Sequence, residues 1–269
     1  MKQTRTVIIL GLIMTLSAMG CQVGSVTFEN VSLFRTPGKV IEESRPISDI
    51  SGVHLATLGD LAIKIGETET LVIEAEDTVM KNIETQVIDG VLKIKNRNNT
   101  SLRNLKPVYY TLTVKSLDSI VISSSGNIEA PNLQADQFSI RISSSGDLVM
   151  GDLKTSDLTI NLSSSGNMRM GLFEADTLDL SISSSGDLDI LGGEVASQLI
   201  NISSSGNYSA RDLASEEADV RISSSGSATI FVTEQLVARL SSSGDLYYLG
   251  DPQLNASSSS SGDIKHLSD

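Results

Sequence analysis

The stretch "SISSSGDLDI", residues 181–190, decides how this chain folds. Its centre is three serines followed by a glycine, and this tetrapeptide occurs eight times between residues 123 and 262. Its glycines recur at one constant interval from Gly126 to Gly226, and the last two intervals, to Gly244 and to Gly262, are slightly shorter. An unfolded Ser/Gly linker has no reason to keep such a spacing. The repeat therefore indicates a folded unit of about 20 residues.

Apolar residues keep fixed positions around the repeat. Leu180 and Ile182 precede the serines at alternate positions, and Leu188 stands two positions after the glycine. Nearly every other unit has apolar residues at these positions, with a mostly polar residue between the first two. A period of two is typical of strands with one buried face. Because one unit cannot bury that face alone, the units must stack, so we predict an all-β, right-handed parallel β-helix (solenoid) with about 20 residues per coil.

The SSSG tetrapeptide is expected to form a corner of each coil. Parity places the central serine, Ser184 in this unit, on the inward side, where an unpaired hydroxyl would cost about 1–3 kcal/mol. We expect these hydroxyls to form a ladder, bonding to one another or to the backbone. Each glycine is expected to turn the chain with a positive φ, which glycine adopts at no steric cost. The turn glycines are Gly126, Gly146, Gly166, Gly186, Gly206, Gly226, Gly244 and Gly262.

The residue after each glycine is polar and small. It is Asn127, Asp147, Asn167, Asp187, Asn207, Ser227, Asp245 or Asp263. In a parallel solenoid these side chains stack in one column, where alternation of Asn with Asp limits repulsion and permits hydrogen bonds. Calcium, which binds carboxylate oxygens, is the alternative, but the GGxGxD repeat typical of calcium-binding solenoids is absent. We favour a structural Asn/Asp ladder.

Residues 1–20 have the pattern of a targeting segment. Lys2 and Arg5 precede an apolar run, residues 7–16, that is too short to span a bilayer as a helix. The sequence "LSAMGC" then ends at Cys21, the only cysteine of the chain. It resembles a bacterial lipobox, in which a lipid is attached to the cysteine, although Ala18 stands where leucine is usual. The alternative is an ordinary secretory signal with an accidental cysteine.

The segments around the regular repeat define the remaining organisation. Residues 21–45 are expected to form a tether and an N-terminal cap. The solenoid is expected over residues 46–269, with irregular coils to about residue 118 and regular coils from about residue 119. In the irregular part, "DLAIKIGETETLVIEAED", "VLKIKN" and "YYTLTVKS" alternate as strands do, and "IDGV" indicates a turn at Gly90. At the other end, Ser258 replaces the apolar residue of the last unit, as an exposed edge requires.

The sequence also resembles a known family. The stretches "ISDISGVHLATLGDLAIKIGETETLVIEAED", "VIDGVLKIKN" and "YYTLTVKSLDSIVISSSGNIEA", with the later "ISSSGDL" units, are similar to the DUF2807 family, the head GIN domain of auto-transporter adhesins. The resemblance covers roughly residues 46–265 but includes no Gly-Ile-Asn tripeptide. It implies a right-handed parallel β-helix in a bacterial envelope protein, often a lipoprotein. It transfers no catalytic residue.

The residues of common active sites are missing or scattered. The chain has two histidines, His54 and His266, without a cysteine nearby, so no transition-metal ligand set is visible. SSSG recurs eight times and is not a GxSxG nucleophile motif. Arg141, Arg221 and Arg239 would share one outward column, but Asn161, Ser181 and Asn201 interrupt it. A solvated strand face explains this column better than a substrate site does.

The net charge of the chain excludes some classes of binding partner. The formal net charge is −13, and no cluster of Lys and Arg offers a nucleic-acid surface. We therefore expect a non-catalytic lipoprotein with a binding, adhesion or structural role, attached through its lipid and located in the cell envelope, with the outer membrane as the expected membrane. Its ligand would be an envelope or extracellular polysaccharide or protein, and no cofactor is expected. The alternatives are a polysaccharide-active β-helix enzyme and a self-assembling structural solenoid.

Overall fold

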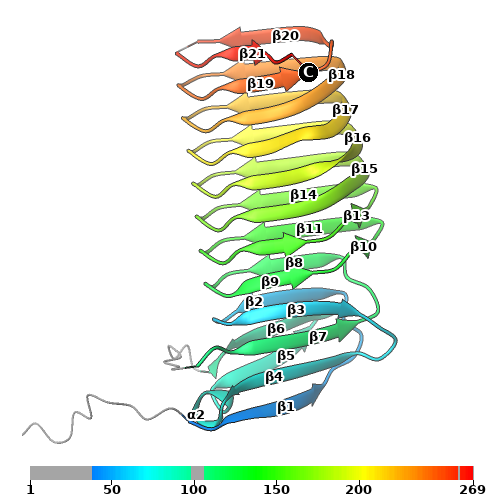
Figure 1. Ribbon diagram of the computed structural model, residues 1–269, viewed down its shortest axis with the longest axis vertical. Coiled ribbons are helices and arrows are strands. Elements are labelled where there is room, and N and C mark those ends of the chain that lie inside the picture. The colour runs from blue at the N-terminus through cyan, green and yellow to red at the C-terminus, as the bar shows by residue number, and fades with distance from the viewer. Residues whose placement is uncertain (1–37, 98–105, 260, 269) are drawn as a thin grey trace, which may run out of the picture. The chain divides into compact units, whose positions relative to one another are not determined.

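The computed structural model describes residues 38–97, 106–259 and 261–268 of the chain. The chain divides into two compact units, residues 1–36 and 37–269, and all described residues belong to the second. Cys21 and the predicted signal peptide therefore lie outside the described residues. The described part is built of strands, with α2 (Asp77–Met80) as its only helix (Figure 1). None of the described residues form a helix long and apolar enough to cross a membrane.

The SSSG repeats form a stack of parallel coils (Figure 1). Ile140 pairs with Ile160, and Ile160 pairs with Leu180, so each residue lies beside its equivalent in the next unit. Further along, Val220 pairs with Ala238, because the last coils are slightly shorter. The predicted parallel β-solenoid is confirmed, and its regular coils have the length of the sequence repeat.

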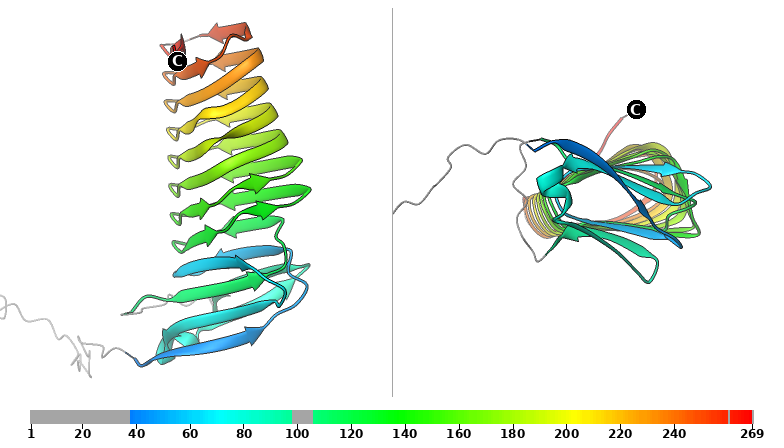
Figure 2. Two further views of the ribbon diagram at one scale, coloured as in Figure 1. Left: turned by 45° about the vertical axis from the view of Figure 1, so that its right-hand side comes forward. Right: turned by 90° about the horizontal axis from the view of Figure 1, so that it is seen from below.

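The strands of the regular coils lie on two faces that meet at the SSSG corner (Figure 2). Face A contains the strands that precede SSSG, and face B contains the strands that follow it. From β15 to β18, one long strand in each coil runs through the opposite bend, which we call the second corner. The strands are β8 (Ser119–Ile122), β9 (Asn127–Ala130), β10 (Leu133–Gln134), β11 (Gln137–Ile142), β12 (Leu148–Met150), β13 (Leu153–Lys154), β14 (Asp157–Leu162), β15 (Met168–Ile182), β16 (Leu188–Ile202), β17 (Tyr208–Ile222), β18 (Ala228–Leu240), β19 (Leu246–Leu249), β20 (Gln253–Ser258) and β21 (Ile264–His266).

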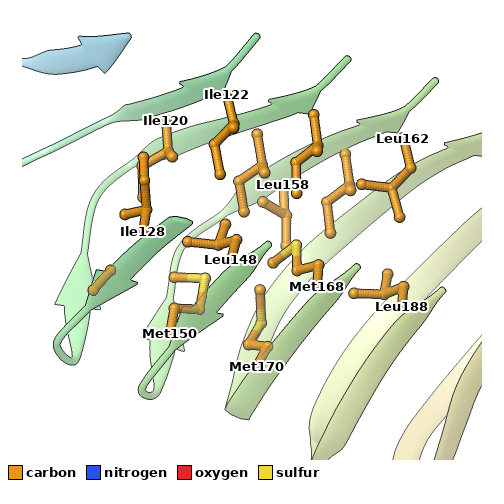
Figure 3. Packing of buried hydrophobic residues seen from close by; sticks show 14 of the residues in the cluster. Ile120, Ile122, Ile128, Leu148, Met150, Leu158, Leu162, Met168, Met170 and Leu188 are labelled. Atoms are coloured by element: carbon orange, nitrogen blue, oxygen red, sulfur yellow. The ribbon is translucent and has the colours of Figure 1, made fainter. Parts of the chain in front are cut away.

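The core lies between the two faces. Ile122 from face A points toward Ile128 and Leu148 from face B (Figure 3), and each of these side chains is at most 2% exposed. Full burial of one such side chain contributes about 1.5–3 kcal/mol. Because every coil adds the same apolar columns, the core continues through the stack as the alternating pattern predicts.

The N-terminal part also forms strands, as expected. They are β1 (Val40–Pro46), β2 (Gly52–Ala56), β3 (Asp60–Ile65), β4 (Thr70–Glu76), β5 (Ile83–Ile88), β6 (Val91–Asn96) and β7 (Tyr109–Val114). The predicted turn at Gly90 is the β5–β6 hairpin, in which Asp89 and Gly90 have positive φ. β1 spans the boundary at residue 45 between the predicted cap and the predicted solenoid.

The N-terminal coils do not stack in chain order. β2 lies between β6 and β8, and β3 lies between β7 and β9. The β2–β3 coil therefore contacts the first regular coil directly, although β6 and β7 separate them in the sequence. Beyond these coils, β1 pairs with β4 and β4 pairs with β7, both antiparallel. These antiparallel strands close the N-terminal end of the stack.

Candidate binding surface

The SSSG glycines lie at the corners, but the reason we gave for them was wrong. None of Gly126, Gly146, Gly166, Gly186, Gly206, Gly226, Gly244 and Gly262 has a positive φ. A Cβ at Gly186 would instead lie 2.8 Å from the carbonyl oxygen of Ser164, and closer still to that of Gly166. The same approach to the neighbouring coil recurs at the other seven glycines. Glycine is required there because coil-to-coil contact leaves no room for a side chain.

The serines of the SSSG corner also contribute to the contact between neighbouring coils. The Gly186 amide donates a hydrogen bond to the carbonyl of Ser164, at 3.1 Å, and equivalent bonds recur in other coils. The central serines are half-buried rather than buried. Ser124 donates its hydroxyl to backbone carbonyls of the β2–β3 coil, 2.6 Å from Thr57 O. Backbone bonding, one of the two arrangements expected for these hydroxyls, is thus observed at Ser124.

The Asn/Asp ladder is confirmed by its hydrogen bonds. Asp147 Oδ1 accepts the Asn167 amide at 2.8 Å, Asn167 Oδ1 accepts the Asp187 amide at 3.1 Å, and Asp187 Oδ1 accepts the Asn207 amide at 2.8 Å. The ladder begins at Asn127, whose Nδ2 donates to Asp60 Oδ1 at 2.9 Å. These oxygens satisfy backbone amides of the next coil. Among the described residues, no group of three or more His, Cys, Asp or Glu is arranged to hold a metal ion.

The predicted outward column of face A is present. Arg141 aligns with Asn161, and further along Asn201 aligns with Arg221 and Arg221 with Arg239. Arg221 and Arg239 both pair with Asp219, at 2.7 and 3.0 Å. The column is therefore a polar strand face with locally compensated charges.

The two histidines lie at different places. His54 Nε2 is 2.6 Å from Ser123 Oγ, so the pair joins the β2–β3 coil to the first regular corner. Burial, and secondly the nearby charge of Lys93, lowers the pKa of His54 below its usual value. His266 stacks on Tyr248 in the last coils, with ring centroids 5.0 Å apart.

Sequence reasoning missed a groove along the second corner, which we call the corner groove. It has a volume of about 640 Å³ and crosses successive coils from Gln134 to Thr233. Its floor includes Thr155 and Ser215, both buried, which donate hydrogen bonds to Asp136 O at 3.0 Å and Phe231 O at 2.8 Å. These bonds join the two side chains to the backbone of neighbouring coils. A short, mostly polar stretch recurs midway between consecutive SSSG corners and marks the position of the groove in the sequence. The concave shape of the groove could not be inferred from that stretch.

The walls of the corner groove are mainly acidic. Asp136, Asp176, Glu194 and Glu216 line it, while Lys154 forms an ion pair with Glu174. Carboxylates spread along successive coils repel an acidic polymer. The groove is therefore suited to an extended partner that is neutral or basic.

These features define a class of protein, a parallel β-solenoid whose corners are built for stacking and whose second corner carries a long groove. The chain belongs to the DUF2807 family: the family model described as "Putative auto-transporter adhesin, head GIN domain" matches residues 49–171 and 149–252. A search of curated proteins found none that matches this chain.

Solved structures share the fold. A "putative adhesin" from Parabacteroides merdae is 20% identical with a TM-score of 0.79, covering 86% of this chain and 97% of its own. A "putative adhesin" from Parabacteroides distasonis is 20% identical with a TM-score of 0.77, covering 86% of this chain and 98% of its own. A "Putative lipid binding protein" from the same organism is 23% identical with a TM-score of 0.71 and the same coverage. At these identities the likeness concerns the fold alone.

Proposed function

We propose that this protein is a non-catalytic lipoprotein of the cell envelope that binds an extended partner along the corner groove, as an adhesin does. The observation that carries the proposal is the course of the groove, which passes from coil to coil instead of ending in a closed pocket. A long ligand can contact several coils at once, and many weak contacts on a rigid scaffold add up without large ordering costs. Membership of an adhesin-like family agrees with this role.

The arrangement of the groove favours binding over catalysis. Its carboxylates recur along the stack, for example Asp136, Asp176 and Glu216. Catalysis depends on one set of groups held in a single geometry around the reacting atoms. These carboxylates recur in every second coil, at intervals of about twice the 4.8 Å coil spacing, and offer repeated contacts to a repeated partner instead.

A bulky side chain placed in the corner groove tests whether the groove is the binding surface. Ser156 is exposed on the groove wall, and Ser156→Trp should obstruct the passage without changing the core. Ser139→Trp, at an exposed position of face A, is the matched control. Binding of the purified mature chain would be measured on a glycan array and on immobilised extracellular-matrix proteins. We expect Ser156→Trp to weaken binding about tenfold or more, and Ser139→Trp to change it less than about twofold.

Three results would reject this proposal. Equal losses in both variants, or no binding of the wild-type chain to any probe, would show that the groove is not the binding surface. Release of reducing ends from a polysaccharide, abolished by changing one groove carboxylate, would favour the enzyme alternative.

Attachment to the membrane through Cys21 is part of the same proposal. Several acyl chains on one protein hold it stably in a bilayer. Cys21→Ser should abolish incorporation of labelled palmitate and release the chain from the membrane fraction. The residues after the cysteine, Gln22 and Val23, are not acidic, which by resemblance to enterobacterial sorting favours the outer membrane. Unchanged labelling of the variant would contradict the anchor.

A further inference from the structure

A second concave surface lies on face B, apart from the corner groove. It has a volume of about 700 Å³ and is lined by β7, β3, β9 and the start of β12. Figure 1 shows β7, β3 and β9 in succession. These strands are neighbours only because the β2–β3 coil is inserted out of chain order, which places Asp60 between Tyr109 and Asn127. We call this surface the Tyr109 hollow.

Apolar side chains form part of the lining of the Tyr109 hollow. Tyr109 is 48% exposed and Val149 is 52% exposed, although both are large apolar side chains on a sheet. Between them, the small side chain of Ala62 lies beside Thr111 on one strand and Glu129 on the other. The short Ala62 side chain accounts for the depression, because its neighbours on both strands are larger.

The rim of the hollow supplies hydrogen-bond acceptors in fixed positions. Asp60 Oδ1 accepts from Asn127 Nδ2 at 2.9 Å, and Asn127 Oδ1 accepts the Asp147 amide at 3.1 Å. The Asn/Asp ladder thus orients these groups before any ligand arrives. Glu129 adds a third carboxylate. Preorganised acceptors favour a ligand with hydroxyl donors, since little side-chain order is lost on binding.

The charge of the hollow selects against acidic ligands. Among the described residues that line it, no side chain carries a positive charge. Arg169, which follows Val149 on the next strand, faces Asp189 with a separation of 3.8 Å. A carboxylate or sulfate on a ligand would therefore meet Asp60, Glu129 and Asp147, and the Lys64 cation on β3 lies outside the lining, two residues beyond Ala62.

We propose that the Tyr109 hollow binds a neutral sugar unit of an oligosaccharide. A pyranose ring has a face of C–H groups and a rim of hydroxyls. The C–H face, which carries slight positive charge, can pack on the negatively charged face of the Tyr109 ring. The hydroxyls can donate to the rim carboxylates. A hollow of this volume, lined by apolar side chains and a few oriented polar groups, has the general character of small-ligand sites.

Titration by NMR with the purified mature chain tests this inference. The probes are four neutral disaccharides (cellobiose, maltose, lactose and N,N′-diacetylchitobiose) and one acidic disaccharide that contains glucuronic acid. We expect at least one neutral probe to shift resonances of Tyr109, Ala62 and Glu129, with affinity at least about tenfold higher than that of the acidic probe. Tyr109→Ala should weaken that binding about tenfold, whereas Tyr109→Phe, which keeps the ring, should change it less than about twofold.

The matched control is Tyr247→Ala, which removes an aromatic residue on the same face but in a distant coil. It should leave sugar affinity unchanged. Absence of shifts in the hollow with every neutral probe, equal affinity for the acidic probe, or equal losses in Tyr109→Ala and Tyr247→Ala would each overturn the inference. Because the hollow and the corner groove are separate, Ser156→Trp should not affect these titrations, so either proposal can fail alone.

Discussion

Strands β1–β7 and strands β8–β19 both build coils, yet the two regions connect neighbouring coils differently. In the regular region, Ile140 pairs with Ile160, its equivalent in the very next unit. In the N-terminal region, Gly52 pairs with Ser119, a distant residue in the sequence, and the strands between them fold around the end of the stack. Short separations cost little loop entropy, whereas the long connections are closed only when several strands assemble together. The difference shows that one architecture can be reached by local repetition or by long-range closure.

The sharpest test of this contrast is deletion of one unit. Removing residues 147–166 joins Gly146 to Asn167 and keeps every column in register, so the fold should survive with one coil fewer. Removing only residues 147–156 deletes half a coil, so a strand of face A would follow the SSSG corner where a strand of face B belongs, and cooperative folding should be abolished. Circular dichroism and thermal melting measure both. Similar melting curves for the two deletions would contradict a coil with the length of the sequence repeat.

The second test separates the two reasons for glycine. Gly90 in the N-terminal hairpin has φ of 78°, which asparagine tolerates, whereas Gly186 in a regular corner faces backbone carbonyls. Gly186→Asn should destabilise the protein by about 3 kcal/mol, because backbone atoms cannot move aside as side chains do. Gly90→Asn should cost less than about 1 kcal/mol. Denaturant unfolding measures both, and equal losses would show that close approach does not govern the regular corners.

The smallest expected effect concerns the junction of the two regions. Because the pKa of His54 is lowered in the folded protein, the unfolded chain binds the proton more readily. Stability should therefore decrease as pH falls below about 6.5, the usual value for histidine, until the folded pKa is passed. His54→Gln should make the melting temperature slightly less sensitive to pH in this range. His266→Gln, in β21, is the control, and an equal change there would rule out a specific role of the junction.

Much of the regular region could be predicted because its information is local. The positions of Ile182 and Leu188 relative to Gly186 defined strands, core and corner together. The ladder followed from one polar residue per unit. The structural reason for the SSSG glycines could not be predicted, because a positive φ and a close approach of neighbouring backbone both require glycine.

The N-terminal order could not be predicted because strand pairing there is not local. A signal did exist: Gly59 occupies the position of Gly126, and Val53, Leu55 and Leu61 keep the apolar spacing of a regular unit. Without the serines this unit was predicted only as part of the irregular coils, and its match to a regular unit was not recognised. The Tyr109 hollow depends on that placement and on the size of Ala62 between two neighbours, so it became visible only in the folded structure.

The length of the stack is proportional to the number of repeat units. Each repeat unit adds one coil, and each coil lengthens the stack by about 4.8 Å. Duplication of a unit would move the far end outward while leaving the closed end and the Tyr109 hollow unchanged. The number of repeat units thus sets the length of the stack. This length can change by one coil at a time while the existing surfaces stay the same.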